Sequence, residues 1–144
     1  MLRISKKSEY GIIALKYMLN QPKGTVIRAK EIAETYRISS EIMAKILQKL
    51  ARKGIVQSYQ GAKGGYLLTK DGAGISLSEI IETIDGPVGI VECMSDAECG
   101  CRQLDHCNIR DPFRLIQKQF KTFLSGISLA DINNEIEIQR VVWH

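Results

Sequence analysis

Residues 39–54 read Ser39-Ser40-Glu41-Ile42-Met43-Ala44-Lys45-Ile46-Leu47-Gln48-Lys49-Leu50-Ala51-Arg52-Lys53-Gly54, and this stretch decides the fold. Apolar residues recur in it every three or four positions, which predicts a helix from about Glu41 to Lys53 with one buried face. A serine precedes the helix where it can cap the first turn, and Gly54 ends the helix. The buried stripe is predicted to comprise Ile42, Met43, Ile46, Leu47, Leu50 and Ala51.

The opposite face of the same helix is polar and rich in cations. It consists of Glu41, Lys45, Gln48, Lys49 and Arg52. A shorter helix, predicted over 28–36, comes before it across the turn 37–40. Two helices joined by a tight turn indicate a helix-turn-helix unit whose second helix enters the DNA major groove. An ordinary amphipathic helix with a solvated face has the same pattern, so the next segment bears on the choice.

Two short β-prone runs follow the helix, at 55–60 and 66–68, and the residues between them are Gly61-Ala62-Lys63-Gly64-Gly65. This arrangement predicts a hairpin with a glycine-rich tip. Glycine lets a backbone approach a phosphate closely, and Lys63 places a cation at the tip. A plain surface hairpin is the alternative, but the position directly after a basic helix favours a wing. The predicted fold is therefore mainly α with a small β-hairpin wing.

The formal charge is divided unevenly along the chain. Residues 1–70 contain 14 Lys and Arg against 4 Asp and Glu, whereas residues 71–144 contain 6 against 12. A basic half suits a polyanion such as double-stranded DNA, although a merely lysine-rich surface has the same composition. No apolar run reaches the roughly 20 residues of a membrane helix, and the first residues lack the apolar core of a signal peptide. We therefore expect a cytoplasmic protein with no membrane partner, and 144 residues leave no room for a large catalytic domain.

Two further helices are predicted after the wing. Ser76-Leu77-Ser78-Glu79 has the pattern of a capping box, and Gly86-Pro87 closes the helix that it begins. Asp111-Pro112 gives an N-cap and a first helical proline for a longer helix, which carries a stripe with the spacing of helices that pack side by side. The stripe is Phe113, Ile116, Phe120, Phe123 and Ile127.

That stripe needs an apolar partner. The chain's own core is one partner, but we expect the same helix of a second subunit, which gives a homodimer on an inverted-repeat operator. The predicted architecture is a winged helix-turn-helix domain followed by a long dimerisation helix. Its parts are a DNA-binding domain over 1–72, a connecting helix over 73–90, a cysteine loop over 91–110, and the dimerisation helix with a C-terminal tail over 111–144.

All four cysteines lie close together, at Cys93, Cys99, Cys101 and Cys107. Clustered thiols in a reducing cytosol are more often metal ligands or redox sensors than disulfides. Soft thiolates bind iron–sulfur clusters, zinc or copper(I). Structural zinc sites usually pair their ligands as Cys-x-x-Cys, whereas the spacing here is Cys-x5-Cys-x-Cys-x5-Cys, which favours a cluster. A redox pair at Cys99 and Cys101 is a further alternative, but acidic neighbours disfavour the thiolate that it needs.

Several stretches of the chain together carry a family resemblance. They are Leu2-Arg3-Ile4-Ser5 with Tyr10, the wing over 61–66, Ile80-Ile81 before Gly86-Pro87-Val88, the cysteine loop, and Ile127-Ser128-Leu129-Ala130-Asp131. With them the chain resembles the Rrf2 family of winged-helix transcription regulators over nearly its full length. Within that family it is most similar to the regulators of the SUF iron–sulfur assembly operon. The resemblance implies a homodimer whose affinity for an operator depends on an iron–sulfur cluster, 2Fe-2S or 4Fe-4S, on three loop cysteines.

The resemblance also implies a set of cluster ligands. Cys93, Cys101 and Cys107 match the family pattern best, and Cys99 is an addition to it. Cys99 is then a spare thiol, a replacement for the second ligand, or a fourth ligand. Glu9 stands where related regulators take a fourth ligand from the opposite subunit, and His106 is a further local candidate.

We predict that cofactor state acts on DNA binding through the helix over 76–85. Base or near-base contacts are expected from Ser39, Ser40, Glu41 and Lys45. Contacts to phosphates or groove edges are expected from Lys49, Arg52, Gln60, Lys63 and Arg28. The function predicted is transcriptional regulation without enzymatic activity. The alternatives are a winged-helix DNA binder with a structural zinc and a small thiol redox or metal-transfer protein.

Overall fold

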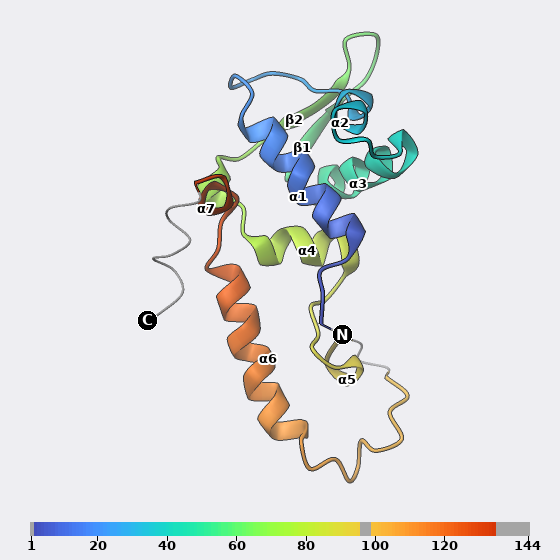
Figure 1. Ribbon diagram of the computed structural model, residues 1–144, viewed down its shortest axis with the longest axis vertical. Helices are drawn as coiled ribbons and strands as arrows, with labels where there is room; N and C mark the ends of the chain where they lie inside the picture. Colours follow the sequence, from blue (N-terminus) through green and yellow to red (C-terminus); the bar gives the residue numbers. More distant parts are fainter. Residues whose placement is uncertain (1, 96–98, 135–144) are drawn as a thin grey trace.

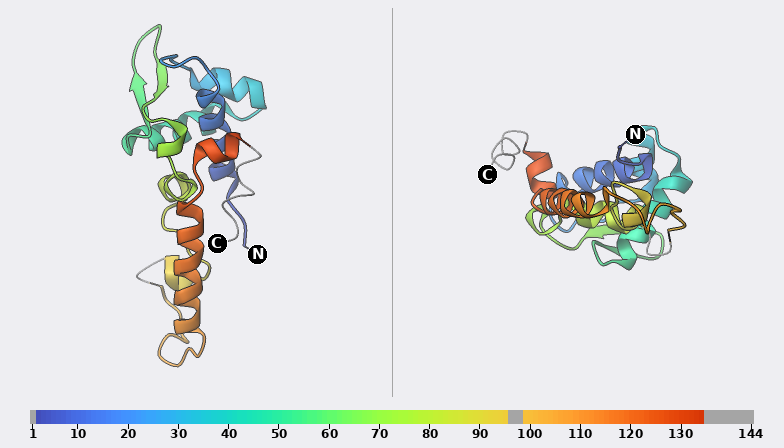
Figure 2. Two further views of the ribbon diagram at one scale, coloured as in Figure 1. Left: turned by 90° about the vertical axis from the view of Figure 1, so that its left-hand side faces the viewer. Right: turned by 90° about the horizontal axis from the view of Figure 1, so that it is seen from below.

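The computed structural model describes residues 2–95 and 99–134 (Figure 1). Helices α1 to α3 and a two-stranded hairpin form one end of the molecule, α4 crosses beneath them, and α6 extends away from that end (Figures 1 and 2). The predicted fold class, mainly α with a β-hairpin wing, is confirmed. The elements are α1 (Lys6–Leu19), α2 (Ala29–Tyr36), α3 (Ser40–Arg52), β1 (Val56–Tyr59), β2 (Gly65–Leu68), the 3-10 turn η1 (Gly72–Gly74), α4 (Leu77–Asp85), α5 (Glu92–Ser95), α6 (Arg110–Ser125) and α7 (Leu129–Asn133).

The helix-turn-helix unit forms where the sequence places it. The Ser39 hydroxyl caps α3 by accepting a hydrogen bond from the Ile42 amide at 3.4 Å. The turn between the helices is closed by Arg37, whose φ of 55° is left-handed. The core side of α3 is Met43, Ile46, Leu47 and Leu50.

One residue predicted to face the core lies at the surface instead. Ile42 is 38% exposed because, at 100° per residue, it lies at the margin of the buried face that Met43, Ile46, Leu47 and Leu50 form. Tyr36 is 43% exposed, and its ring meets that of Tyr17 edge-on with 5.9 Å between centroids. The Tyr36 ring therefore packs on the Tyr17 ring of α1, at the edge of the core.

The wing is an antiparallel pair in which Val56 lies opposite Leu68 and Tyr59 opposite Gly65. A third segment joins it, because the Ile27 and Tyr66 backbones exchange hydrogen bonds at 2.8 and 2.7 Å. This pairing requires glycine at position 65, where a Cβ atom would meet the Ile27 carbonyl at 2.6 Å. The part of β2 nearest the wing tip is therefore fixed to the segment that precedes α2.

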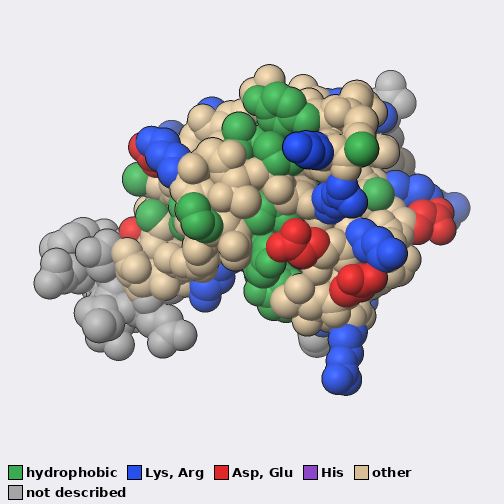
Figure 3. Space-filling view, turned by 90° about the horizontal axis from the view of Figure 1, so that it is seen from above, with side chains coloured by type: hydrophobic (Ala, Val, Ile, Leu, Met, Phe, Trp, Pro, Cys, Tyr) green, Lys and Arg blue, Asp and Glu red, His purple; other side chains and the backbone are tan. Residues whose placement is uncertain are grey.

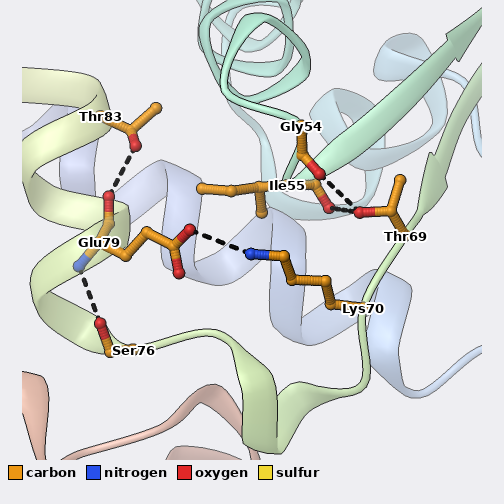
Figure 4. A network of polar contacts seen from close by, with 7 residues as sticks. All are labelled: Gly54, Ile55, Thr69, Lys70, Ser76, Glu79 and Thr83. Atoms are coloured by element: carbon orange, nitrogen blue, oxygen red, sulfur yellow. Dashed lines mark hydrogen bonds and ion pairs between the residues drawn. The ribbon is translucent and has the colours of Figure 1, made fainter.

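Helix α4 is attached to the wing by a polar network (Figure 4). The Ser76 hydroxyl accepts from the Glu79 amide at 3.1 Å, which forms the serine half of the predicted capping box. The Glu79 carboxylate turns to Lys70, whose ammonium lies 3.3 Å away just beyond β2. The Thr69 hydroxyl donates to the carbonyls of Gly54 and Ile55, joining the end of β2 to the start of β1.

The main core draws its buried apolar side chains from α1 to α4, the wing and α7. A smaller cluster of Leu77, Ile81, Leu124 and Ile127 joins α4 to the end of α6. The chain then returns to the main core through α7, where Leu129 is fully buried and its amide donates to the Ile75 carbonyl at 2.8 Å. None of the helices in the described ranges is long and apolar enough to cross a membrane.

The predicted start of α6 is corrected by two residues. The helix begins at Arg110, and Ile109 precedes it without a side-chain cap, so Asp111 is not the N-cap. Pro112 is the third helical residue rather than the first. Proline is tolerated there because the first four amides of a helix have no intrahelical acceptor.

Candidate DNA interface and cysteine loop

The first turns of α3 carry four of the predicted DNA contacts. Ser39, Ser40, Glu41 and Lys45 are all exposed at this end of the helix. The Lys45 ammonium lies 2.8 Å from the Glu41 carboxylate, one turn away. The hydrogen bond from Lys45, reinforced by its charge, lowers the pKa of Glu41 below its ordinary value. In this conformation the first turns of α3 therefore present the ion pair of Glu41 and Lys45 beside the hydroxyls of Ser39 and Ser40.

The wing contributes a second set of polar groups. Gln60 and Lys63 are exposed at its tip. Arg28, at the N-cap of α2, donates a guanidinium hydrogen bond to the Ala62 carbonyl and so ties the tip to α2. Figure 3 views the end of the molecule that carries the wing, where separate Lys and Arg side chains lie among apolar patches, with acidic side chains beside several of them. The cations on this face suit contacts with a phosphate backbone.

The last two predicted contacts lie further along α3. Arg52 is exposed at the final residue of the helix. Lys49 is exposed as well, but its ammonium donates to the Ile84 carbonyl of α4 at 2.8 Å. The structure therefore places the predicted residues on α3, the wing and the start of α2, but it directs Lys49 at another helix.

Three of the four cysteines line one cavity of about 750 Å³ between α5, the loop that follows it and the start of α6. Cys93 comes from α5, and Cys101 and Cys107 come from the loop. His106 lines the same cavity. Cys99 is half-buried and is not among the lining residues that the structure describes.

The thiols that share the cavity are not gathered into a coordination sphere. Within the described ranges, no three His, Cys, Asp or Glu side chains lie close enough to hold one ion. The Cys101 thiol instead lies 3.5 Å from the Gln103 amide oxygen. The donor set nevertheless fits a thiolate-bound cluster, because three soft ligands reach one cavity from two segments.

Glu9, the predicted ligand from the opposite subunit, lies in the first turn of α1. Its carboxylate is 2.6 Å from the Lys6 ammonium, and this hydrogen bond raises the pKa of Lys6. A role at the partner's cavity requires a second subunit and stays a prediction. His106, the local alternative, is exposed at the cavity rim.

Helix α6 presents an apolar edge to solvent. Among its described residues Leu124 alone is buried. Ile116 is 49% and Phe123 42% exposed. Ile127, the last residue of the predicted stripe, instead lies beyond the end of α6 and is buried in the smaller core cluster. Phe113 lines the cysteine cavity, and Phe120 packs on the smaller core cluster. Residues of the predicted stripe therefore lie in three places: at the cavity, at the smaller core cluster and facing solvent.

The sequence did not point to a second apolar feature beside this edge. A hollow of about 470 Å³ lies between the N-terminal segment, the end of α4 and α6. Leu2 and Ile4 line it and are 66% and 40% exposed. Two apolar residues in a short N-terminal segment show no periodicity, so nothing in the sequence signals this site.

Comparison with known proteins identifies the family. The family described as "Rrf2: Iron-dependent Transcriptional regulator" matches residues 4–135. The HTH-type transcriptional regulator IscR of Klebsiella pneumoniae (strain 342) is 32% identical over 138 residues, which cover 95% of this chain and 83% of IscR.

Solved structures agree with this assignment. The structure of CymR (YrzC), the global cysteine regulator of B. subtilis, superposes with a TM-score of 0.72 at 27% identity, covering 94% of this chain and 98% of CymR. T. potens IscR shares the fold, with a TM-score of 0.70 at 22% identity over 99% of this chain and 94% of that one. The relatives are DNA-binding transcriptional regulators, not enzymes. The chain belongs to the Rrf2 family of winged-helix transcriptional regulators.

Proposed function

We propose that this regulator senses iron–sulfur status or oxidative and nitrosative stress through a cluster on Cys93, Cys101 and Cys107. The observation that carries the proposal is the cavity that these three thiols share and that Cys99 does not line. It selects from four cysteines the same three that match the family pattern. Regulation of iron–sulfur assembly genes is the function that the resemblance to regulators of the SUF operon implies, and the matching family is described as iron-dependent.

A cluster bound by these thiols would tie α5 to the start of α6 and would respond to oxidants or nitric oxide. The residues around the thiols support such a site. Cys93 lies on a single-turn helix and the other two lie in a loop, so they can approach one another without disturbing the main core. Phe113 adds an aromatic side chain to the lining of the cavity beside the thiols.

We also propose that the working form is a homodimer that pairs through α6. The exposed apolar edge of α6 and the neighbouring hollow at Leu2 and Ile4 are continuous through Phe120 and Leu124, which line that hollow. A continuous exposed apolar surface of this kind is typical of a protein–protein interface. A two-fold pair would present two α3 helices to one duplex, so its operator would be an inverted repeat.

Anaerobic purification tests the cofactor. We expect a coloured protein with iron and acid-labile sulfide, and we expect Cys107→Ala to lose both while Cys99→Ala keeps them. The two variants are matched because each removes one half-buried thiol of the same loop. A colourless wild-type protein with stoichiometric zinc would reject the cluster and favour the structural zinc alternative.

Salt dependence tests the DNA contacts. Binding to a duplex selected from a random pool by the wild-type protein should weaken with salt, with a log–log slope of about −5 to −9 for roughly 6 to 10 neutralised phosphates. A slope near zero would reject the proposed role of the basic half.

A second candidate function is regulation by thiol chemistry without a cluster. It is favoured by the likeness to CymR, the global cysteine regulator, and by the separation of the thiols in the described cavity. The two candidates differ in one measurement. If protein lacking iron and sulfide binds the selected duplex as tightly as protein isolated without oxygen, and thiol oxidation alone changes the affinity, the second candidate is correct.

A further inference from the structure

Three hydrogen bonds hold the C-terminal end of α4 against α3 and α1. The Lys49 ammonium of α3 donates to the Ile84 carbonyl at 2.8 Å. On the other side, the Ser5 and Ser8 hydroxyls donate to one oxygen of the Asp85 carboxylate at 2.5 and 2.7 Å. We call these five residues the α4 junction. It joins three helices at one point.

The Lys49 contact suits the end of a helix. The last four carbonyls of an α-helix have no intrahelical donor and carry partial negative charge, so a cation beside them is stabilising. Helix α4 ends at Asp85, which makes the Ile84 carbonyl one of these acceptors. Lys49 thus caps α4 from α3, the helix that we expect to enter the major groove.

Packing makes the junction rigid. The Ile84 side chain is 2% exposed and lies between α1 and α3. A Cβ atom at Gly11 of α1 would overlap the Ile84 Cδ1 atom and would lie 3.5 Å from Ile46 of α3. Ser8 is fully buried beside them. Because close-packed side chains have no free volume, a displacement of this end of α4 is passed to both helices.

A short stretch of chain links the junction to the cysteine loop. Gly86 follows Asp85 with a φ of 89°, and Cys93 lies eight positions after Asp85. The stretch between them is bound to α6, because the Gln117 side chain accepts from the Ile90 amide at 2.9 Å and donates to the Val88 carbonyl. A movement of α5 relative to α6 is therefore transmitted to the end of α4 through the stretch that Gln117 binds at Val88 and Ile90.

Resting on the proposed function, we propose that Lys49 is a positioning residue that passes the state of the cysteine loop to α3, in place of the phosphate contact expected from the sequence. A phosphate contact and a positioning contact differ in what their loss changes. Loss of the first reduces the salt dependence of DNA binding, whereas loss of the second reduces the affinity difference between cofactor-loaded and cofactor-free protein.

The test compares Lys49→Gln with Lys63→Gln, a cation of the wing tip that has no described partner in the fold of the domain. Affinity for the selected duplex is measured for the loaded and the cofactor-free form of each full-length protein over a range of salt. For Lys49→Gln we expect an unchanged salt slope and a loaded-to-free affinity ratio that falls toward one. For Lys63→Gln we expect the slope to fall by about 1 to 2 and the ratio to persist.

Two further variants guard against a merely structural effect. Ser8→Ala removes one hydrogen-bond donor to Asp85 without removing a cation. It should therefore lower the loaded-to-free affinity ratio and leave the salt slope of DNA binding unaltered. Lys49→Arg retains a cationic donor and should restore part of the ratio lost in Lys49→Gln. Hydrogen exchange of the amides over 84–90 should rise in Lys49→Gln and Ser8→Ala but not in Lys63→Gln.

The outcomes separate the two proposals. A wild-type ratio of one would reject cluster sensing before any variant is compared. For coupled sites we expect a wild-type ratio of about 5 to 150. If the wild-type protein has such a ratio and Lys49→Gln keeps it while its salt slope falls, the positioning role alone is rejected.

Discussion

In the proposed DNA-binding half of this protein, α1 to α4 and the wing share one buried core, to which α7 adds Leu129. In the cysteine-bearing half, by contrast, α6 buries Leu124 alone among its described residues. The thiols of that second half are all half-buried, and Ile116 and Phe123 face solvent. The first half thus contains the contacts that determine its own structure. The second half presents ligands and apolar surface, which are the features of a segment completed by a bound group and a second subunit.

This difference suits a regulator. A reader of DNA needs a fixed recognition surface, and the core of α3, with Leu47 and Leu50 fully buried, provides one. A sensor needs a segment whose arrangement depends on what is bound, because a ligand shifts an equilibrium only by its different affinity for two states. The α4 junction lies at the boundary between the two, which is where such a shift has to be transmitted.

The largest expected effect is on the core of the DNA-binding half. Leu47 is fully buried, so Leu47→Ala should lower the free energy of unfolding by about 2–5 kcal/mol. Leu115 on α6 is 60% exposed, and Leu115→Ala should change it by less than about 0.5 kcal/mol. Urea unfolding of both variants at one protein concentration is the measurement. Equal losses would show that α6 belongs to the same cooperative core.

The next effect is on self-association. Ile116→Asp places a charge on the exposed apolar edge of α6 and should weaken the homodimer by at least about 2 kcal/mol, as for a residue at the centre of an interface. Sedimentation equilibrium measures it. Thr122→Asp is the matched control, since Thr122 is also exposed on α6 but lies away from that edge at 100° per residue. If both variants associate like the wild type, the dimer does not use this edge.

The same division explains what could be predicted from the sequence. The helix-turn-helix and the wing depend on local signals: the spacing of apolar residues in α3, the cap at Ser39 and the glycines around Lys63. These signals act within a few residues, so the sequence determines them directly. The exposure of Ile42 could not be predicted in this way, because at the margin of the buried face it depends on what the neighbouring helices cover.

Contacts between distant segments were beyond sequence reasoning. The pairing of Ser8 with Asp85 joins residues 77 positions apart, and no pattern near either residue indicates it. Lys49 has the spacing of an exposed cation, and its contact with Ile84 depends on the packing angle of two helices. The thiols were found by their number and spacing, but their shared cavity required the structure.

A smaller effect is expected where the second half returns to the first. At α7 the Ser128 hydroxyl accepts from the Asp131 amide at 3.1 Å, and the Asp131 carboxylate accepts from the Ser128 amide at 2.7 Å. Ser128→Ala should therefore cost about 1 kcal/mol of unfolding free energy. Thermal unfolding measures it, with Ser125→Ala, an exposed serine at the end of α6, as the control. An unchanged Ser128→Ala variant would mean that α7 is not part of the unfolding unit.

The smallest expected effect lies on the recognition surface itself. Because Lys45 lowers the pKa of Glu41 through a hydrogen bond, the pair contributes above the pKa of Glu41 in the unfolded chain, and the contribution is lost as the pH falls through the folded value. Both side chains are exposed, so the pair should matter little for folding.

Lys45→Gln should raise the pKa of Glu41 toward its ordinary value, as measured by NMR titration of the carboxyl carbon. Lys30→Gln, which removes the partner of Glu34 on α2, should leave it unchanged. The pair has a consequence for DNA binding, because Lys45 has to leave Glu41 before it can contact a phosphate or a base. Duplex phosphates raise the pKa of a nearby carboxyl by themselves, so the duplex is added to both proteins. Binding should raise the pKa of Glu41 more in the wild-type protein, which also loses the Lys45 contact, than in Lys45→Gln, and equal rises would show that Lys45 stays with Glu41 at the interface.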